Sequence, residues 1–169
     1  SPLYGDRCED VAFNSLPAAF TPDYKGLHYL TGANQVQLDK ENKSPGIENQ
    51  GTMFSYDAHD YRCCQHNHAF GWPYFAEHLW MATSDSGVAA VLYAPCEAHA
   101  TVGTPADPVK VTVKVATEYP FDENITVSVR TARPVSFPMY LRIPGWCAEP
   151  LISINGKRID AGPGSGPRF

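Results

Sequence analysis

The sequence predicts an α+β chain in which a helical part, residues 1–84, precedes an antiparallel β-sandwich, residues 85–169. Two observations predict a globular chain with this division. Apolar residues before residue 84 recur at helical spacing, whereas many of those after it alternate with polar residues, the period of a strand with one buried face. Hydrophobic residues make up 43% of the chain, which is enough for a packed core.

The helical part contains two predicted helices separated by a long irregular stretch. Residues 6–16 place apolar side chains at helical spacing, with Cys8 predicted to be buried among them, and Pro17 is predicted to end this helix. Residues 72–83 form the clearest predicted helix, with a proline in its first turn and a buried stripe. The stretch between them, residues 21–62, has no sustained period, and a loop of that length is usually functional or wraps another element.

The second part consists of short predicted strands. Their alternating or continuous apolar runs cover residues 88–93, 109–115, 125–129, 137–143 and 152–154. The last run leads into Asn155-Gly156, a strong signal for a hairpin turn. Because the sequence ends soon after this hairpin begins to return, we expect the sandwich to be truncated. Both ends of the chain are interpreted as cut points.

Charge and hydropathy argue against two classes of partner. The formal net charge is -5 and the Lys and Arg residues are scattered, which disfavours nucleic acid. No apolar run approaches the roughly 20 residues that span a bilayer, so we expect a soluble chain, cytoplasmic or secreted. Two glycosylation acceptor sequences, at Asn42 and Asn124, leave the compartment open. The sequence does not indicate the oligomeric state.

The chemistry of the chain is predicted to centre on the adjacent pair Cys63–Cys64. Residues 66–68 follow closely with two imidazoles and an amide, just before the predicted helix. A thiol acts as a nucleophile or a metal ligand when it is ionised, and a metal, a nearby cation or a helix N-terminus stabilises the thiolate. Arg62 and the predicted helix provide two of these conditions.

Other interpretations of this segment remain open. A free cysteine often serves as a small buried apolar residue. An odd number of cysteines, five, argues against a closed disulfide framework, and the spacing typical of structural zinc is absent. On an extended chain His66 and His68 would point the same way. They are candidates for metal ligands or substrate contacts, but polar loop residues are the favoured interpretation.

A set of motifs covers nearly the whole chain. The most specific is Cys63-Cys64 followed by Asn67 and by Gly71-Trp72-Pro73. The others are residues 9–23, His28-Tyr29 through Asn34-Gln35-Val36, residues 79–83, residues 88–95, residues 141–146 and Ile154-Asn155-Gly156. Together these motifs resemble glycoside hydrolase family 127, which contains bacterial β-L-arabinofuranosidases.

The resemblance implies that residues 1–84 are the last helices and loops of an (α/α)6 barrel and that a β-sandwich follows. It also implies a retaining hydrolase with a cysteine nucleophile and a Zn²⁺ ion held by one Glu and three Cys, one of them the nucleophile. By motif, Cys63 resembles the nucleophile and zinc ligand, and Cys64 resembles a second zinc ligand. The acid/base Glu, the zinc-binding Glu and the third Cys are expected before residue 1, so the chain alone is predicted to be inactive.

The resemblance further implies a glycan substrate with L-arabinofuranosyl or related pentosyl linkages. Four residues are candidates for contacts to sugar hydroxyls on position alone: His28, Tyr29, His66 and Asn67. The alternative hypothesis is a non-catalytic chain, with the strand part as a carbohydrate-binding or packing module and the cysteines as structural zinc ligands. A third is a family member that has changed its reaction and kept the metal.

Overall fold

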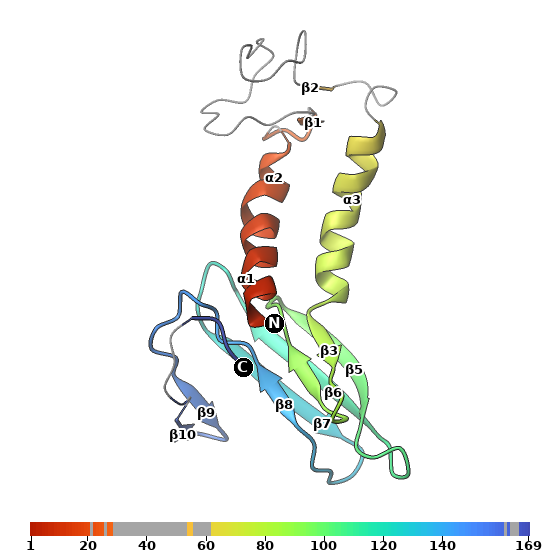
Figure 1. Cartoon of the computed structure of the whole chain (residues 1–169), viewed down its shortest axis with the longest axis vertical. Helices are drawn as coiled ribbons and strands as arrows, with labels where there is room; N and C mark the ends of the chain where they lie inside the picture. Colours follow the sequence, from red (N-terminus) through yellow and green to blue (C-terminus); the bar gives the residue numbers. More distant parts are fainter. Residues whose placement is uncertain (21, 26, 29–53, 56–61, 161, 163–165) are drawn as a thin grey trace. The chain divides into compact units, whose positions relative to one another are not determined.

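The computed structural model describes residues 1–20, 22–25, 27–28, 54–55, 62–160, 162 and 166–169 (Figure 1). The chain divides into two compact units, one formed by Ser1–Glu9 with Phe75–Phe169 and the other by Asp10–Tyr74. Among the described residues, none of the helices combines the length and the apolar character that crossing a membrane requires.

The chain begins with helical residues that run without a break from residue 2 to residue 18. They comprise α1 (Pro2–Asp10), the π-helical segment η1 (Val11–Ser15) and α2 (Leu16–Ala18). The helix predicted at residues 6–16 is confirmed and is longer than expected. Pro17 does not end it, because the helical residues include Pro17 and continue to Ala18. The predicted burial of Cys8 is wrong, since this side chain is exposed.

The helix predicted at residues 72–83 lies earlier in the chain. Helix α3 spans Arg62–Glu77, so the cysteine pair lies in its first turn and not in a preceding loop. Pro73 lies inside the helix, where it removes one backbone donor without ending the helix. Strand β3 (Trp80–Ala82) follows, because the tight turn after it returns the chain to pair with β4 (Val88–Ala90). Cross-strand pairing therefore overrides the helical spacing here.

Within the described residues, the strands form four small sheets. Strands β5 (Cys96–Val102), β6 (Val109–Thr117) and β7 (Ile125–Thr131) make an antiparallel sheet, and β1 (Leu27–His28) pairs with β2 (Phe54–Ser55). The third sheet has the order β3-β4-β8, in which β4 and β8 (Met139–Leu141) are parallel, a pairing that the predicted antiparallel arrangement did not include. Strand β5 was not predicted.

The last two strands form the predicted hairpin. Strand β9 (Ile152–Ile154) pairs with β10 (Lys157–Ile159) across Asn155 and Gly156, whose φ angles are 50° and 78°. Positive φ at both central residues is what a type I′ turn requires, and Asn-Gly adopts it readily. The hairpin prediction is confirmed.

A buried cluster joins the two three-stranded sheets. Val88 of one sheet packs with Val102, Val109 and Val111 of the other, and all four are at most 3% exposed. Trp80 and Met139 pack against this cluster. The alternating valines of β6 thus face the core, as the sequence predicted, and leave its polar residues on the opposite face.

Candidate functional site

The two adjacent thiols lie at the solvent-facing start of α3. Cys63 and Cys64 are the second and third residues of the helix. Cys63 is exposed and Cys64 is half-buried, and their Sγ atoms are 3.7 Å apart. Neither sulfur is enclosed in an apolar interior, so both can be reached by a ligand.

Two opposing effects act on the ionisation of Cys64. Burial raises the pKa of the Cys64 thiol, and the hydrogen bond and charge of Cys63 raise it further. The first turn of a helix carries a partial positive charge that favours a thiolate. A bound cation would act in the same direction as the helix and far more strongly. Ionisation of Cys64 is therefore expected to depend on what binds beside it.

The geometry of the two sulfurs fits two ligands of a tetrahedral zinc ion. Zn–S bonds of about 2.3 Å at a tetrahedral angle place two sulfurs about 3.8 Å apart. The observed separation of 3.7 Å agrees with this value. Among the described residues no group of three or more Cys, His, Asp or Glu side chains could hold a metal. The pair therefore fits part of a zinc site.

The polar residues that follow the cysteines lie on the same helix. Asn67 donates a hydrogen bond from Nδ2 to the carbonyl of Cys63 (2.7 Å), which braces the turn that carries the thiols. His66 is exposed. The chain is helical here and not extended, so His66 and His68 do not point the same way, because residues two apart on a helix face different directions.

His68 contacts the segment that ends the first run of helical residues. Its Nε2 lies 2.7 Å from the carbonyl oxygen of Leu16, and its ring meets that of Phe20 edge-on at 4.3 Å. Gly71, three residues later, lies very close to Leu16. A Cβ atom added to Gly71 would lie 2.6 Å from Cδ1 of Leu16. His68 and Gly71 therefore hold α3 beside the η1–α2 segment, which is a structural role.

The remaining predicted site residues are placed only in part. His28 belongs to β1, opposite Phe54 of β2. Tyr29 lies outside the described residues. The structure therefore brings Cys63, Cys64, His66 and Asn67 together on one helical segment, and it leaves the other two candidates untested.

Sequence reasoning missed a buried ionic cluster between α1 and the strands. Arg142 is 1% exposed and forms ion pairs with Asp6 and Glu9, the latter 5% exposed. Tyr119 donates a hydrogen bond to Glu9 (2.7 Å), and Tyr93 donates one to the Arg142 carbonyl (2.6 Å). The available signal was an arginine inside the apolar run Leu-Arg-Ile-Pro, because an arginine buried there needs anionic partners.

Two family models match successive parts of the chain. Residues 1–77 match the family model "Beta-L-arabinofuranosidase, GH127 catalytic domain". Residues 87–166 match the family model "Beta-L-arabinofuranosidase, GH127 middle domain". A search of curated proteins gave no match.

One solved structure supports the fold. It is the crystal structure of Ara127N-Se, a GH127 β-L-arabinofuranosidase from Geobacillus stearothermophilus T6, with a TM-score of 0.72 and 20% sequence identity. The match covers 95% of this chain and 24% of that chain. The chain thus spans about a quarter of the length of the structure it matches.

Proposed function

The chain belongs to glycoside hydrolase family 127, and on that premise we propose that the protein is a retaining hydrolase of the β-L-arabinofuranosidase type with Cys63 as its nucleophile. The observation that carries this proposal is the exposed Sγ of Cys63, in the first turn of α3 and 3.7 Å from a second sulfur. A helix N-terminus favours the ionised form that attack on carbon requires.

The proposal includes the architecture implied by the family. Residues 1–84 would be the end of an (α/α)6 barrel, and residues 85–169 the beginning of a β-sandwich. The helical residues 2–18 and α3 support the first assignment. The valine cluster shared by two three-stranded sheets supports the assignment to a β-sandwich, because a sandwich consists of two sheets packed face to face.

The reaction is a double displacement at the anomeric carbon. The Cys63 thiolate forms a C–S bond while the glycosidic C–O bond breaks, and a general acid, which the family resemblance places outside this chain, protonates the departing oxygen. Water then displaces the sulfur after losing its proton to the same group acting as a base. Two inversions retain the configuration of the sugar.

The surrounding residues orient and ionise the nucleophile. Cys63 and Cys64 would hold a zinc ion whose charge keeps the sulfur ionised near neutral pH. Asn67 fixes the carbonyl of Cys63 and thereby the helical turn that aims its side chain. The exposed His66 is a proposed contact to the hydroxyls of a glycan substrate, as are Asn67, His28 and Tyr29.

The nucleophile is tested by Cys63→Ser in the full-length protein. We expect kcat/KM on an aryl β-L-arabinofuranoside to fall by about 1,000-fold or more, because a serine hydroxyl is not ionised near neutral pH. Cys8→Ser is the matched control, since Cys8 is also an exposed cysteine on a helix. Full activity of Cys63→Ser would exclude the nucleophile assignment, and absence of zinc from the purified protein would exclude the proposed activation.

A further inference from the structure

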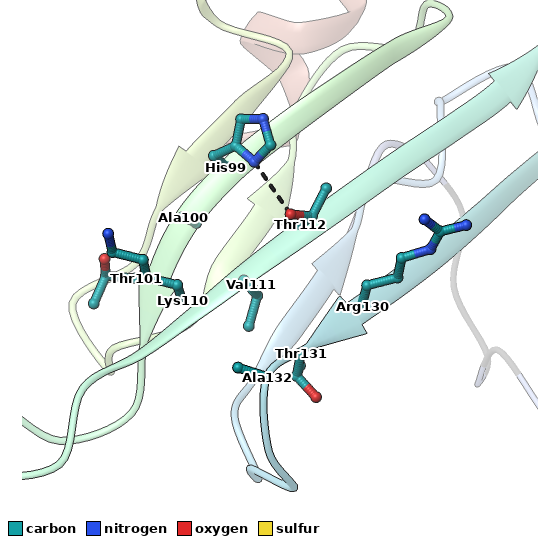
Figure 2. Close-up of a pocket in the computed structure, with 9 residues that line it drawn as sticks. All are labelled: His99, Ala100, Thr101, Lys110, Val111, Thr112, Arg130, Thr131 and Ala132. Atoms are coloured by element: carbon teal, nitrogen blue, oxygen red, sulfur yellow. Dashed lines mark hydrogen bonds between the residues drawn. The ribbon is translucent and has the colours of Figure 1, made fainter.

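The outward face of the β5-β6-β7 sheet carries a shallow groove with unpaired positive charge. The polar residues of β6 alternate with its buried valines, so Lys110, Thr112 and Lys114 share one face. Figure 2 shows His99 and Arg130 on the neighbouring strands on either side of Thr112. The groove has a volume of about 600 Å³.

The strand register aligns these side chains across the sheet. Thr112 lies directly opposite His99 on β5 and opposite Arg130 on β7, and Lys110 lies opposite Thr101. Opposite residues of an antiparallel pair share a face. His99 Nδ1 lies 3.1 Å from Thr112 Oγ1, which holds the imidazole beside this hydroxyl. The groove is thus lined by two exposed cations, the hydroxyls of Thr101, Thr112 and Thr131, and an imidazole.

The charge of this face is opposite to that of the chain. Its strand residues include three cations and one carboxylate, Glu97, whereas the chain as a whole has a net charge of -5. Glu97 lies 3.4 Å from His99 Nε2 and opposite Lys114 in the register. Within the part of the chain that the structure describes, neither Lys110 nor Arg130 forms an ion pair. Both cations are exposed and available to an anionic partner.

We propose that this groove binds an acidic oligosaccharide through the carboxylates of its uronic acid units. A guanidinium such as that of Arg130 matches a carboxylate with two parallel hydrogen bonds, and the Lys110 ammonium adds a second positive charge. The hydroxyls of Thr101 and Thr112 and the ring of His99 suit the hydroxyls of a sugar. A neutral sugar would leave both cations unused, and a nucleic acid would need a larger basic surface. The site is separate from the proposed hydrolysis and does not require Cys63.

The test is a calorimetric titration of the full-length protein with the tetramer of galacturonic acid in about 50 mM salt, where screening is moderate. The same tetramer with methyl-esterified carboxylates is the uncharged probe. We expect the acid to bind and the ester not to bind. In the double variant Lys110→Ala/Arg130→Ala we expect the acid to bind at least about fivefold more weakly, the loss of two exposed charge contacts.

The double variant Lys157→Ala/Arg158→Ala is the matched control, because it removes one exposed lysine and one exposed arginine from the β9–β10 hairpin. We expect it to bind the acid within twofold of the unchanged protein. Three results would overturn the proposal: no binding of the acid at millimolar concentration, equal binding of the ester, or equal weakening in both double variants. Equally tight binding of a single-stranded DNA tetramer would overturn the assignment to uronic acids.

This test separates the groove from the proposed catalytic site. We expect the groove variant to cleave a small aryl β-L-arabinofuranoside at the normal rate, because such a substrate has no carboxylate for Lys110 and Arg130. We expect Cys63→Ser to bind the acidic tetramer normally. Loss of tetramer binding in Cys63→Ser would contradict a groove that acts independently of the thiols.

Discussion

The first turn of α3 and the cluster around Arg142 hold their polar groups in opposite ways. Cys63 is exposed, and among the described residues its sulfur makes a polar contact with the sulfur of Cys64. The Arg142 side chain is buried and is surrounded by two carboxylates and a backbone carbonyl. One group of atoms is open to a partner, whereas the other is already paired with carboxylates and a carbonyl within the fold.

This difference indicates which changes affect reactivity and which affect stability. An exposed group with few bonds contributes little to folding and remains free for chemistry. A buried charge contributes through its partners, and removal of one partner leaves the others without compensation in a low-dielectric interior. Substitutions in the two regions should therefore give opposite results in activity and unfolding measurements.

The largest expected effect on stability comes from Arg142→Met. This change leaves Asp6 and Glu9 without their cation, and we expect the free energy of unfolding to fall by about 3–5 kcal/mol. Urea unfolding followed by tryptophan fluorescence measures it, since Trp146 stacks on Tyr119 beside the cluster. Cys63→Ser should change the same quantity by less than about 0.5 kcal/mol.

A triple variant tests whether the loss arises from uncompensated charge. Asp6→Asn/Glu9→Gln/Arg142→Met removes the cation and both anions together, so we expect it to recover part of the stability lost in Arg142→Met. A triple variant less stable than the single variant would show that packing of the arginine, and not its charge, stabilises this region.

The second prediction concerns alkaline pH. Burial raises the pKa of Tyr93 to about 12, and burial together with Glu9 also raises the pKa of Tyr119. Above pH 10 the unfolded chain loses the tyrosine proton while the folded chain keeps it, so the stability present below about pH 10 is lost as pH rises toward 12. For Tyr93 alone two pH units correspond to about 3 kcal/mol.

The control for this prediction is Tyr93→Phe, which has no phenolic proton. Its free energy of unfolding should fall less steeply between pH 10 and 12 than that of the unchanged protein, as measured by urea unfolding at each pH. Equal slopes for the two proteins would mean that Tyr93 titrates in the same range in the folded and unfolded chains.

Much of the strand half could be predicted from sequence, because its signals are local. The valines of β6 alternate with polar residues, and Asn155-Gly156 specifies its own turn. The error at residues 80–82 has a different origin. Those residues fit a helical stripe, but they pair with β4, a contact decided by the return of the chain and not by local spacing.

The site could be predicted only as a motif. The sequence identified Cys63 and Cys64 but placed them in a loop, because a proline at position 73 suggested that the helix began there. The sequence analysis also treated His66 and His68 alike, as polar loop residues or site candidates. Only His68 has a structural contact with Leu16, and because Leu16 is far away in the sequence, only the fold brings its carbonyl to His68.

The third prediction separates these two histidines. His68→Leu removes the hydrogen bond to Leu16 and the edge-on contact with Phe20, so we expect a loss of about 1–2 kcal/mol in urea unfolding. His66→Leu is the matched control and should change stability by less than about 0.5 kcal/mol. If His66 contacts the substrate, His66→Leu should also raise KM, while stability stays nearly unchanged. Equal destabilisation by the two substitutions would contradict a structural role specific to His68.

The smallest expected effect distinguishes the two thiols from each other. Burial and the neighbouring Cys63 raise the pKa of Cys64, and Cys64 is also the less exposed of the pair. Because alkylation requires a thiolate, iodoacetamide should modify Cys63 several times faster than Cys64 in the metal-free protein near pH 8, as measured by tandem mass spectrometry. Added Zn²⁺ should slow both reactions if the two sulfurs bind it together. Protection of Cys64 alone would assign the metal to one sulfur and would separate the proposed nucleophile from the zinc site.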